Sequence, residues 1–170
     1  YSYPEITFLN PVMKAELDGY QKNRPNTIVA PYLAMCAATP RSMEYRYYGD
    51  TWRLTPAPKG WDRKLLITPG IMRANDIPGE HYLICPSHDY INFYMEKMEK
   101  SYKTLKLRGW YTDWADVRWC NNAHHGHGWI DWNGKRRPTW NFRSIREFTR
   151  RIYTFMKSLD KDSVFMIHSS

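Results

Sequence analysis

A helix-length amphipathic segment followed by a short apolar strand occurs twice in the second half of the chain. The first segment spans residues 88–105 and leads into Gly109–Asp113. The second begins at Phe142 and leads, through a short polar turn, into a buried strand at Val164–Ile167. Helices that alternate with strands in this way are typical of parallel βαβ units. The sequence therefore predicts an α/β fold built on a parallel sheet.

Each predicted helix carries an apolar stripe at helical spacing. The first helix begins after Pro86-Ser87, with Asp89 in its first turn, where the helix dipole favours a negative charge. The arginines between the stripe residues of the second helix are expected to face solvent. The stripe of the first helix is Ile91, Tyr94, Met95, Met98, Tyr102 and Leu105; that of the second is Phe142, Ile145, Ile152 and Phe155, which we expect to be buried, with Leu159 on the same face.

The first half of the chain contains fewer regular elements. A helix is predicted to start at Pro11, because proline is favoured in the first turn of a helix. Residues 27–30 are predicted to form a buried strand, with Pro31 at its exit, since proline is poorly tolerated inside a central strand. Residues 32–86 are predicted to be a long irregular segment, interrupted by a short strand at 64–68.

The connections between these elements are asymmetric. Those that leave the strands are long and rich in polar and aromatic residues, whereas those that enter them, such as 160–163, are short. Long βα loops on one face are typical of a (β/α)₈ TIM-barrel enzyme, and a complete barrel needs about 250 residues. Residues 1–170 are therefore expected to be part of one catalytic barrel-type domain, truncated at both ends. A small, complete three-layer α/β domain is the alternative.

Charge and composition argue against several kinds of binding partner and structure. The net charge is +8, but the basic residues are scattered, and no RNA-binding signature or helix-turn-helix is visible, so nucleic acid is an unfavoured partner. No stretch of about 18 apolar residues is present, so no membrane span is predicted. The three cysteines are odd in number and widely spaced, so they indicate no disulfide framework.

The segment from Leu105 to Asp131 concentrates the candidate catalytic chemistry. Asp113 ends a predicted strand, and His168 ends the next one. In α/β folds ligands bind at the carboxyl ends of parallel strands, so the two side chains are expected at one mouth of the sheet. Asp116 follows on the loop. The candidate catalytic residues are Asp113, His168 and Asp116.

Aromatic and basic residues surround these candidates. Apolar faces of sugars pack on flat aromatic rings, and arginine and histidine can bind hydroxyl groups, so the predicted partner is a carbohydrate substrate. We expect Asp113, Arg118, His168 and at least two of the tryptophans 114, 119 and 129 to line one cleft. The candidate substrate-binding residues are Tyr32, Tyr111, Trp114, Arg118, Trp119, His125, His127 and Trp129.

A second interpretation of the histidine-rich loop is zinc binding. Cys120, His124, His125 and His127 are residue types that coordinate zinc. Their spacing, however, matches no standard zinc finger, and the chain has no HExxH helix. The sequence interpretation therefore predicts neither a metal nor a cofactor.

Three segments carry a resemblance to a known family. Gly109–Asp113, Cys120-Asn121-Asn122 and His125–Trp129 resemble the barrel core of the N-acetylgalactosaminidase-like glycoside hydrolases and their uncharacterised relatives. The resemblance covers roughly residues 80–170 and implies a TIM barrel and a glycosidase activity. Those enzymes carry an adjacent Asp-Glu pair, whereas Trp114 follows Asp113 here. The resemblance therefore does not extend to the pair behind that family's substrate-assisted mechanism.

The predicted function is glycoside hydrolysis of a poly- or oligosaccharide. Such cleavage generally uses two carboxyl groups, and the partner of Asp113 is Asp116, Asp89, Glu80 or a residue outside the sequence. A glycosidase of this kind would be extracellular or periplasmic. The alternative is a non-catalytic carbohydrate-binding module, with a nucleic-acid-binding module ranked below it.

Overall fold

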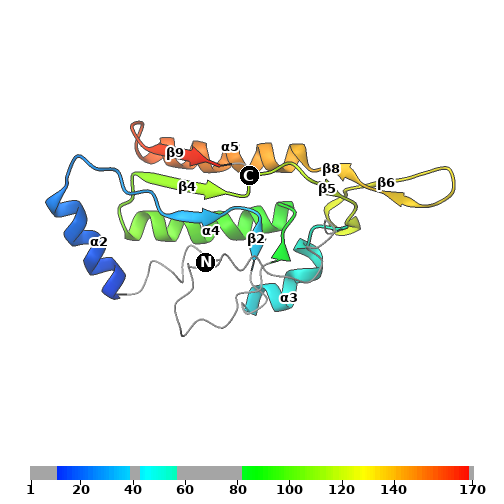
Figure 1. Cartoon of the computed structure of the whole chain (residues 1–170), viewed down its shortest axis with the longest axis horizontal. Helices are drawn as coiled ribbons and strands as arrows, with labels where there is room; N and C mark the ends of the chain where they lie inside the picture. The colour runs from blue at the N-terminus through cyan, green and yellow to red at the C-terminus, as the bar shows by residue number, and fades with distance from the viewer. Residues whose placement is uncertain (1–10, 39–42, 57–81, 169–170) are drawn as a thin grey trace.

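The chain folds around a three-stranded parallel sheet. The computed structural model describes residues 11–38, 43–56 and 82–168. The strands β1 (Tyr32–Ala34), β4 (Gly109–Asp113) and β9 (Val164–Ile167) lie in the order β1-β4-β9 (Figure 1). The helix α4 (His88–Thr104) precedes β4 in the chain, and the helix α5 (Phe142–Leu159) precedes β9. The predicted α/β class with parallel βαβ units is confirmed.

Three short antiparallel strand pairs accompany this sheet among the described residues. β2 pairs with β3, β5 with β8, and β6 with β7. The last two pairs form an extension that Figure 1 shows beyond the carboxyl ends of the central strands. The remaining elements are α2 (Pro11–Asn23), β2 (Ala37–Ala38), α3 (Met43–Trp52), β3 (Tyr82–Leu83), β5 (Trp119–Cys120), the 3₁₀ helix η1 (Ala123–His125), β6 (Trp129–Ile130), β7 (Arg136–Arg137) and β8 (Thr139–Trp140).

The helix α4 forms as its sequence predicts. Ser87 is the N-cap, and its side chain accepts a hydrogen bond from the Tyr90 amide at 3.4 Å. The six predicted stripe residues between 91 and 105 are all buried. Tyr94 lies at the centre of this core, where its hydroxyl accepts a hydrogen bond from the Trp110 indole and its ring contacts Phe148 of α5 edge-on. The stripe of α4 thereby joins the sheet to α5.

The helix α5 confirms half of its predicted stripe. Ile145 and Ile152 are buried and Phe155 packs against the core, but Phe142 is 59% exposed, so the predicted burial of Phe142 was wrong. Leu159, which was placed on the same face, is 48% exposed. Figure 1 shows that α5 begins beyond the carboxyl end of the sheet, which leaves its first residue without sheet to cover it. The buried stripe also includes Phe148 and Met156. Each such side chain stabilises the fold by roughly 1.5–3 kcal/mol.

The first strand is displaced from its predicted position. Residues 27–30 are not a strand; β1 begins after Pro31 instead. The Pro31 carbonyl still accepts a hydrogen bond from the Tyr111 amide at 3.1 Å, so proline opens the pairing rather than closing it. Proline lacks only the donor, and its carbonyl remains available to a neighbouring strand.

The region predicted to be irregular contains several regular elements. Within 32–86 the structure places β1, β2, α3 and β3. These strands are only two or three residues long, too short to show a period in the sequence. The predicted strand at 64–68 lies outside the described residues.

The strand β9 was predicted to be buried, and this was wrong. Val164, Met166 and Ile167 are 37%, 43% and 46% exposed. β9 is an edge strand of the described sheet, and only Phe165 turns toward the core beneath the helices. Among the described residues, no helix is both long and apolar enough to cross a membrane.

Close packing at Gly109 gives a stability prediction. A Cβ atom there would lie 2.8 Å from the side chains of Ala30 and Ile28 and 2.9 Å from the Val29 carbonyl oxygen. We expect Gly109→Ala to lower the free energy of unfolding by about 1–3 kcal/mol, because the backbone must shift to admit the methyl group. The control is Gly19→Ala in α2, where nothing lies within 4 Å of the new atom. Urea unfolding should show the control to be neutral or up to about 1 kcal/mol more stable. Equal losses in both variants would contradict the packing at Gly109.

Candidate functional site

At the carboxyl end of the sheet, the side chains of Tyr32 on β1 and Asp113 on β4 meet that of His168, which follows β9. Tyr32, Tyr111 and Met166 are aligned across the strands, and their side chains lie on the face opposite the helices. Asp113 and His168 each follow two residues later on that face. The His168 amide donates to the Thr112 carbonyl at 2.8 Å, so strand pairing continues to this point.

Asp113 is held by direct contacts on both carboxylate oxygens. The Tyr32 hydroxyl donates to Oδ2 at 2.5 Å, and His168 Nδ1 lies 3.2 Å from Oδ1. The Trp114 amide also donates to Oδ1 at 2.7 Å. The Asp113 side chain is 10% exposed, whereas that of His168 is 54% exposed. These contacts hold the carboxylate in one orientation. The predicted juxtaposition of Asp113 and His168 is present.

The residue after Asp113 has an unusual backbone. Trp114 has a φ of 59°, in the left-handed region that non-glycine residues rarely occupy. Such a conformation costs on the order of 1–3 kcal/mol and is common at functional sites. Here it turns the chain so that the Trp114 amide meets the carboxylate of Asp113.

The carboxylate of Asp116 pairs with the guanidinium of Arg118. The two side chains form an ion pair at 2.5 Å and are 15% and 21% exposed. The Arg118 amide donates to Asn141 Oδ1 at 2.7 Å, which fixes the loop against the start of α5. That Asp116 and Arg118 line one cleft with Asp113 stays a prediction.

Exposed aromatic rings occupy the extension formed by β5 to β8. Trp119 stacks on Trp140 with ring centroids 3.8 Å apart, and the two are 47% and 52% exposed. Trp129 is 54% exposed on β6. The β6–β7 hairpin is stabilised by a hydrogen bond from the Arg137 guanidinium to the Asp131 carboxylate, which lowers the pKa of Asp131. Tyr32 and Tyr111 meet edge-on at 5.1 Å on the open face of the sheet. The flat surfaces expected for a sugar are thus accessible.

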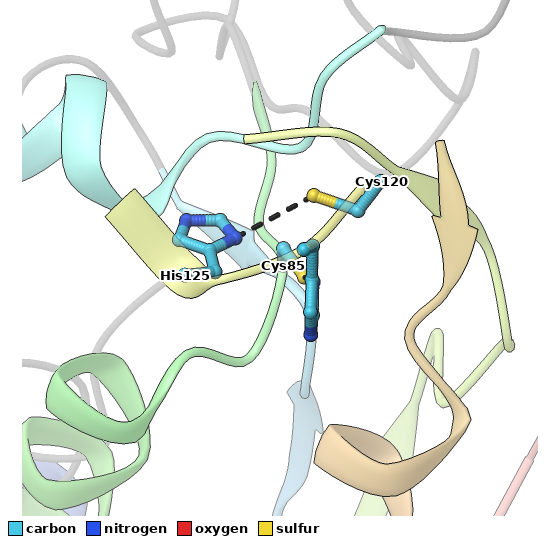
Figure 2. A group of neighbouring side chains, drawn as sticks. Cys85, Cys120 and His125 are labelled. Carbon is cyan, nitrogen blue, oxygen red and sulfur yellow. Dashed lines mark hydrogen bonds between the residues drawn. The ribbon is translucent and has the colours of Figure 1, made fainter. Parts of the chain in front are cut away.

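Two histidines of the loop, His125 and His127, lie beside buried cysteines. His125 and His127 were assigned to substrate binding, but His125 Nδ1 lies 3.5 Å from the Cys120 sulfur, and His127 Nδ1 lies 3.2 Å from the Cys85 sulfur. One ligand-type atom from each of these four residues lies within 4.8 Å of all the others. Figure 2 shows the Cys120 thiol and the His125 ring directed toward each other, with Cys85 beside them. His124, the other histidine proposed for zinc, is exposed and outside the cluster.

The two thiols of this cluster influence each other. A hydrogen bond between them lowers the pKa of Cys120 and raises the pKa of Cys85. The neighbouring His125 and His127 rings also favour the thiolate of Cys120. Both sulfurs are fully buried and unbridged. Cys85 was missed in the sequence because it lies 42 residues before His127, and only the fold brings them together.

Comparison with known proteins gives a likeness in fold. No protein-family model matches the chain, and no curated protein matches it. A crystal structure of the Paenibacillus sp. cycloisomaltooligosaccharide glucanotransferase complexed with cycloisomaltoheptaose is similar, with a TM-score of 0.55 and 16% identity. The match covers 89% of this chain and 20% of that chain, so this chain spans about a fifth of that enzyme. The chain therefore shares its fold with a stretch of a carbohydrate-active enzyme, and no comparison links it to the N-acetylgalactosaminidases.

Proposed function

We propose that this chain forms part of a (β/α)-barrel glycoside hydrolase in which Asp113 is a catalytic carboxylate. The observation that carries the proposal is the position of that carboxylate at the carboxyl end of the middle strand, contacted by Tyr32 from one side and His168 from the other. Residues from several strand ends meet in this way in the active sites of barrel enzymes. The fold shared with a glucanotransferase agrees with this proposal.

Two features of the sheet support a barrel. The spatial order β1-β4-β9 follows the chain order, as it does around a closed barrel. The sheet face opposite the helices carries the exposed Tyr32, Val164 and Met166, which further strands would cover in a barrel. The extension formed by β5 to β8 also leaves from the carboxyl end of β4, where barrel enzymes build their active sites (Figure 1).

The contacts of Asp113 suit a reacting carboxylate. Glycoside hydrolysis needs one carboxyl group as nucleophile or base and a second as the proton donor. Tyr32 and His168 hold Asp113 in one orientation, which limits the reorganisation needed during the reaction. Asp116 is engaged by Arg118, and Glu80 lies outside the described residues. The proton donor is accordingly proposed to be Asp116, Glu80, Asp89 or a carboxyl group beyond this sequence.

The second candidate is a carbohydrate-binding module without catalysis. It is favoured by the stacked, exposed Trp119 and Trp140 and by the full set of protein contacts on Asp113, which a purely structural aspartate would also have. Both candidates predict sugar binding, and only the first predicts bond cleavage.

Release of reducing ends separates the two candidates. The protein at its full length should be incubated with cycloisomaltoheptaose, dextran and a panel of aryl glycosides, and reducing ends or aryl alcohol measured over time. Turnover on at least one substrate is expected, and Tyr32→Phe should slow it, because Asp113 loses its Oδ2 contact. Binding of these sugars without any cleavage would support the carbohydrate-binding module and contradict the proposed glycoside hydrolase.

The exposed tryptophan of β6 gives a prediction about binding. Trp129→Ala should raise KM by roughly 3- to 10-fold, because a ring contact contributes about 0.5–1.5 kcal/mol, while kcat changes little. Trp132→Ala is the matched control, since it removes the same kind of ring from the turn that follows β6 rather than from the strand itself. Steady-state kinetics of both variants on one substrate provide the measurement. A lower kcat with an unchanged KM in Trp129→Ala would place this ring at the reacting bond instead.

A further inference from the structure

We propose that Cys85, Cys120, His125 and His127 form a structural zinc site. Two cysteines and two histidines are a common ligand set for a zinc ion bound only by protein side chains. The four ligand-type atoms converge from separate parts of the chain: the link between β3 and α4, β5, η1 and the turn after it. This inference does not depend on the glycosidase proposal.

The separations between ligand atoms fit one tetrahedral ion. Zinc–sulfur bonds of about 2.3 Å and zinc–nitrogen bonds of about 2.0–2.1 Å place ligand atoms roughly 3.3–3.8 Å apart in a tetrahedron. The Cys85 sulfur lies 3.2 Å from His127 Nδ1, and the Cys120 sulfur lies 3.5 Å from His125 Nδ1. Every other separation in the set is within 4.8 Å. A contraction of at most about 1.5 Å in the widest separation brings all four to bonding positions.

The outer nitrogen of each histidine is already fixed. His125 Nε2 hydrogen-bonds to the Thr51 carbonyl, which can only accept, so this nitrogen carries the proton and Nδ1 presents its lone pair to the cluster. His127 Nε2 lies 3.2 Å from the Ser144 hydroxyl. Zinc-bound histidines characteristically use the second ring nitrogen in this way. The Asn141 amide also donates to the Cys85 sulfur at 3.8 Å, as a partner to a metal-bound thiolate would.

Local backbone geometry aims both histidines at the same point. Asn122 caps η1 by accepting from the His124 amide, and Gly126 ends η1 with a φ of 69°. Gly128 follows with a φ of 84°, and a Cβ there would lie 2.7 Å from the Arg137 carbonyl oxygen. Left-handed glycines on both sides of His127 thus reverse the chain between the two ligands.

Four protein ligands leave no open coordination position, so the zinc is structural rather than catalytic. The apolar cluster around this region is small, comprising Leu54, Leu83 and the two cysteines, with Trp114 packed against it. A small apolar cluster stabilises a segment weakly, and a metal commonly supplements it. The ion joins the extension carrying Trp119 to the start of α4, and through Thr51 to α3.

Metal content and cobalt substitution test this proposal. The chain purified under reducing conditions and equilibrated with zinc should contain about one zinc per chain by elemental analysis. Cobalt(II) in place of zinc should give thiolate-to-cobalt charge transfer and the intense visible bands of a tetrahedral site. His125→Ala and Cys85→Ala should each lose the stoichiometric metal. The controls His124→Ala and Cys36→Ala should keep it, because His124 is an exposed neighbour and Cys36 is a buried cysteine outside the cluster.

A milder variant keeps the test decisive if the ligand variants fail to fold. Ser144→Ala removes only the partner of His127 Nε2 and should weaken zinc affinity by about 10- to 100-fold, measured by competition with a chromophoric chelator. Zinc-free wild-type protein without tetrahedral cobalt bands would overturn the site. So would a Cys85–Cys120 disulfide found under reducing conditions, iron bound in preference to zinc, or metal loss in His124→Ala equal to that in His125→Ala.

Discussion

Asp113→Asn is expected to lower kcat by about 10²- to 10⁴-fold, the range that a positioned acid or base group contributes. KM should change little, because the amide keeps the size of the carboxylate and can still accept from the Tyr32 hydroxyl. It loses the negative charge that attacks the anomeric carbon or stabilises the oxocarbenium-like transition state. Steady-state kinetics on a substrate that the wild type cleaves provide the measurement.

The control for this substitution is Asp162→Asn. Asp162 is exposed in the turn before β9, at the opposite end of the strands from Asp113. The kcat of Asp162→Asn should equal that of the wild type. Near-normal turnover in Asp113→Asn would mean that the Asp113 carboxylate is structural and that the reacting carboxyl groups lie elsewhere.

Removal of zinc is expected to lower the melting temperature by about 8–16 °C. Zinc present at 1,000 times its Kd stabilises the folded state by about 4 kcal/mol, and in a chain of this size each kcal/mol shifts Tm by about 2–4 °C. A strong chelator should therefore destabilise the wild type and Cys36→Ala alike. Cys85→Ala should already melt at the lower temperature and should not respond to the chelator.

Calorimetry with and without chelator, and after zinc is restored, measures this effect. The extension carrying β5 to β8 should lose amide-exchange protection first, since the proposed ion joins it to the start of α4. A wild-type Tm that is the same with and without chelator would contradict a structural metal.

The parallel core could be predicted from sequence because its elements are long enough to show a period. The stripe of α4 is buried throughout, and the strand that follows ends at Asp113 as expected. Asp113 and His168 could be placed together because parallel strands end on the same edge of a sheet. The exposure of Phe142 could not be predicted, since a helical period does not show where the sheet stops.

The extension and its cysteine–histidine cluster could not be predicted in the same way. β5, β6, β7 and β8 are two residues each, and no period can be seen in so short a strand. Three of the four proposed ligands lie between 120 and 127, but Cys85 reaches them only through the pairing of β3 and the packing of α4. A tertiary contact over that separation leaves no local pattern in a single sequence.

Chemical rescue of Asp113→Gly tests whether the Asp113 carboxylate takes part in glycosidic bond cleavage. This variant should be nearly inactive on an aryl glycoside that the wild type cleaves, and added azide should restore turnover and yield a glycosyl azide, because the small anion takes the place of the missing carboxylate. The configuration of that product would show whether Asp113 acts as the nucleophile or as the acid/base. We expect azide to rescue Asp113→Gly, whereas Asp162→Gly should keep the turnover of the wild type and show no rescue. An inactive Asp113→Gly that folds, binds the glycoside and forms no glycosyl azide would contradict a catalytic role for Asp113.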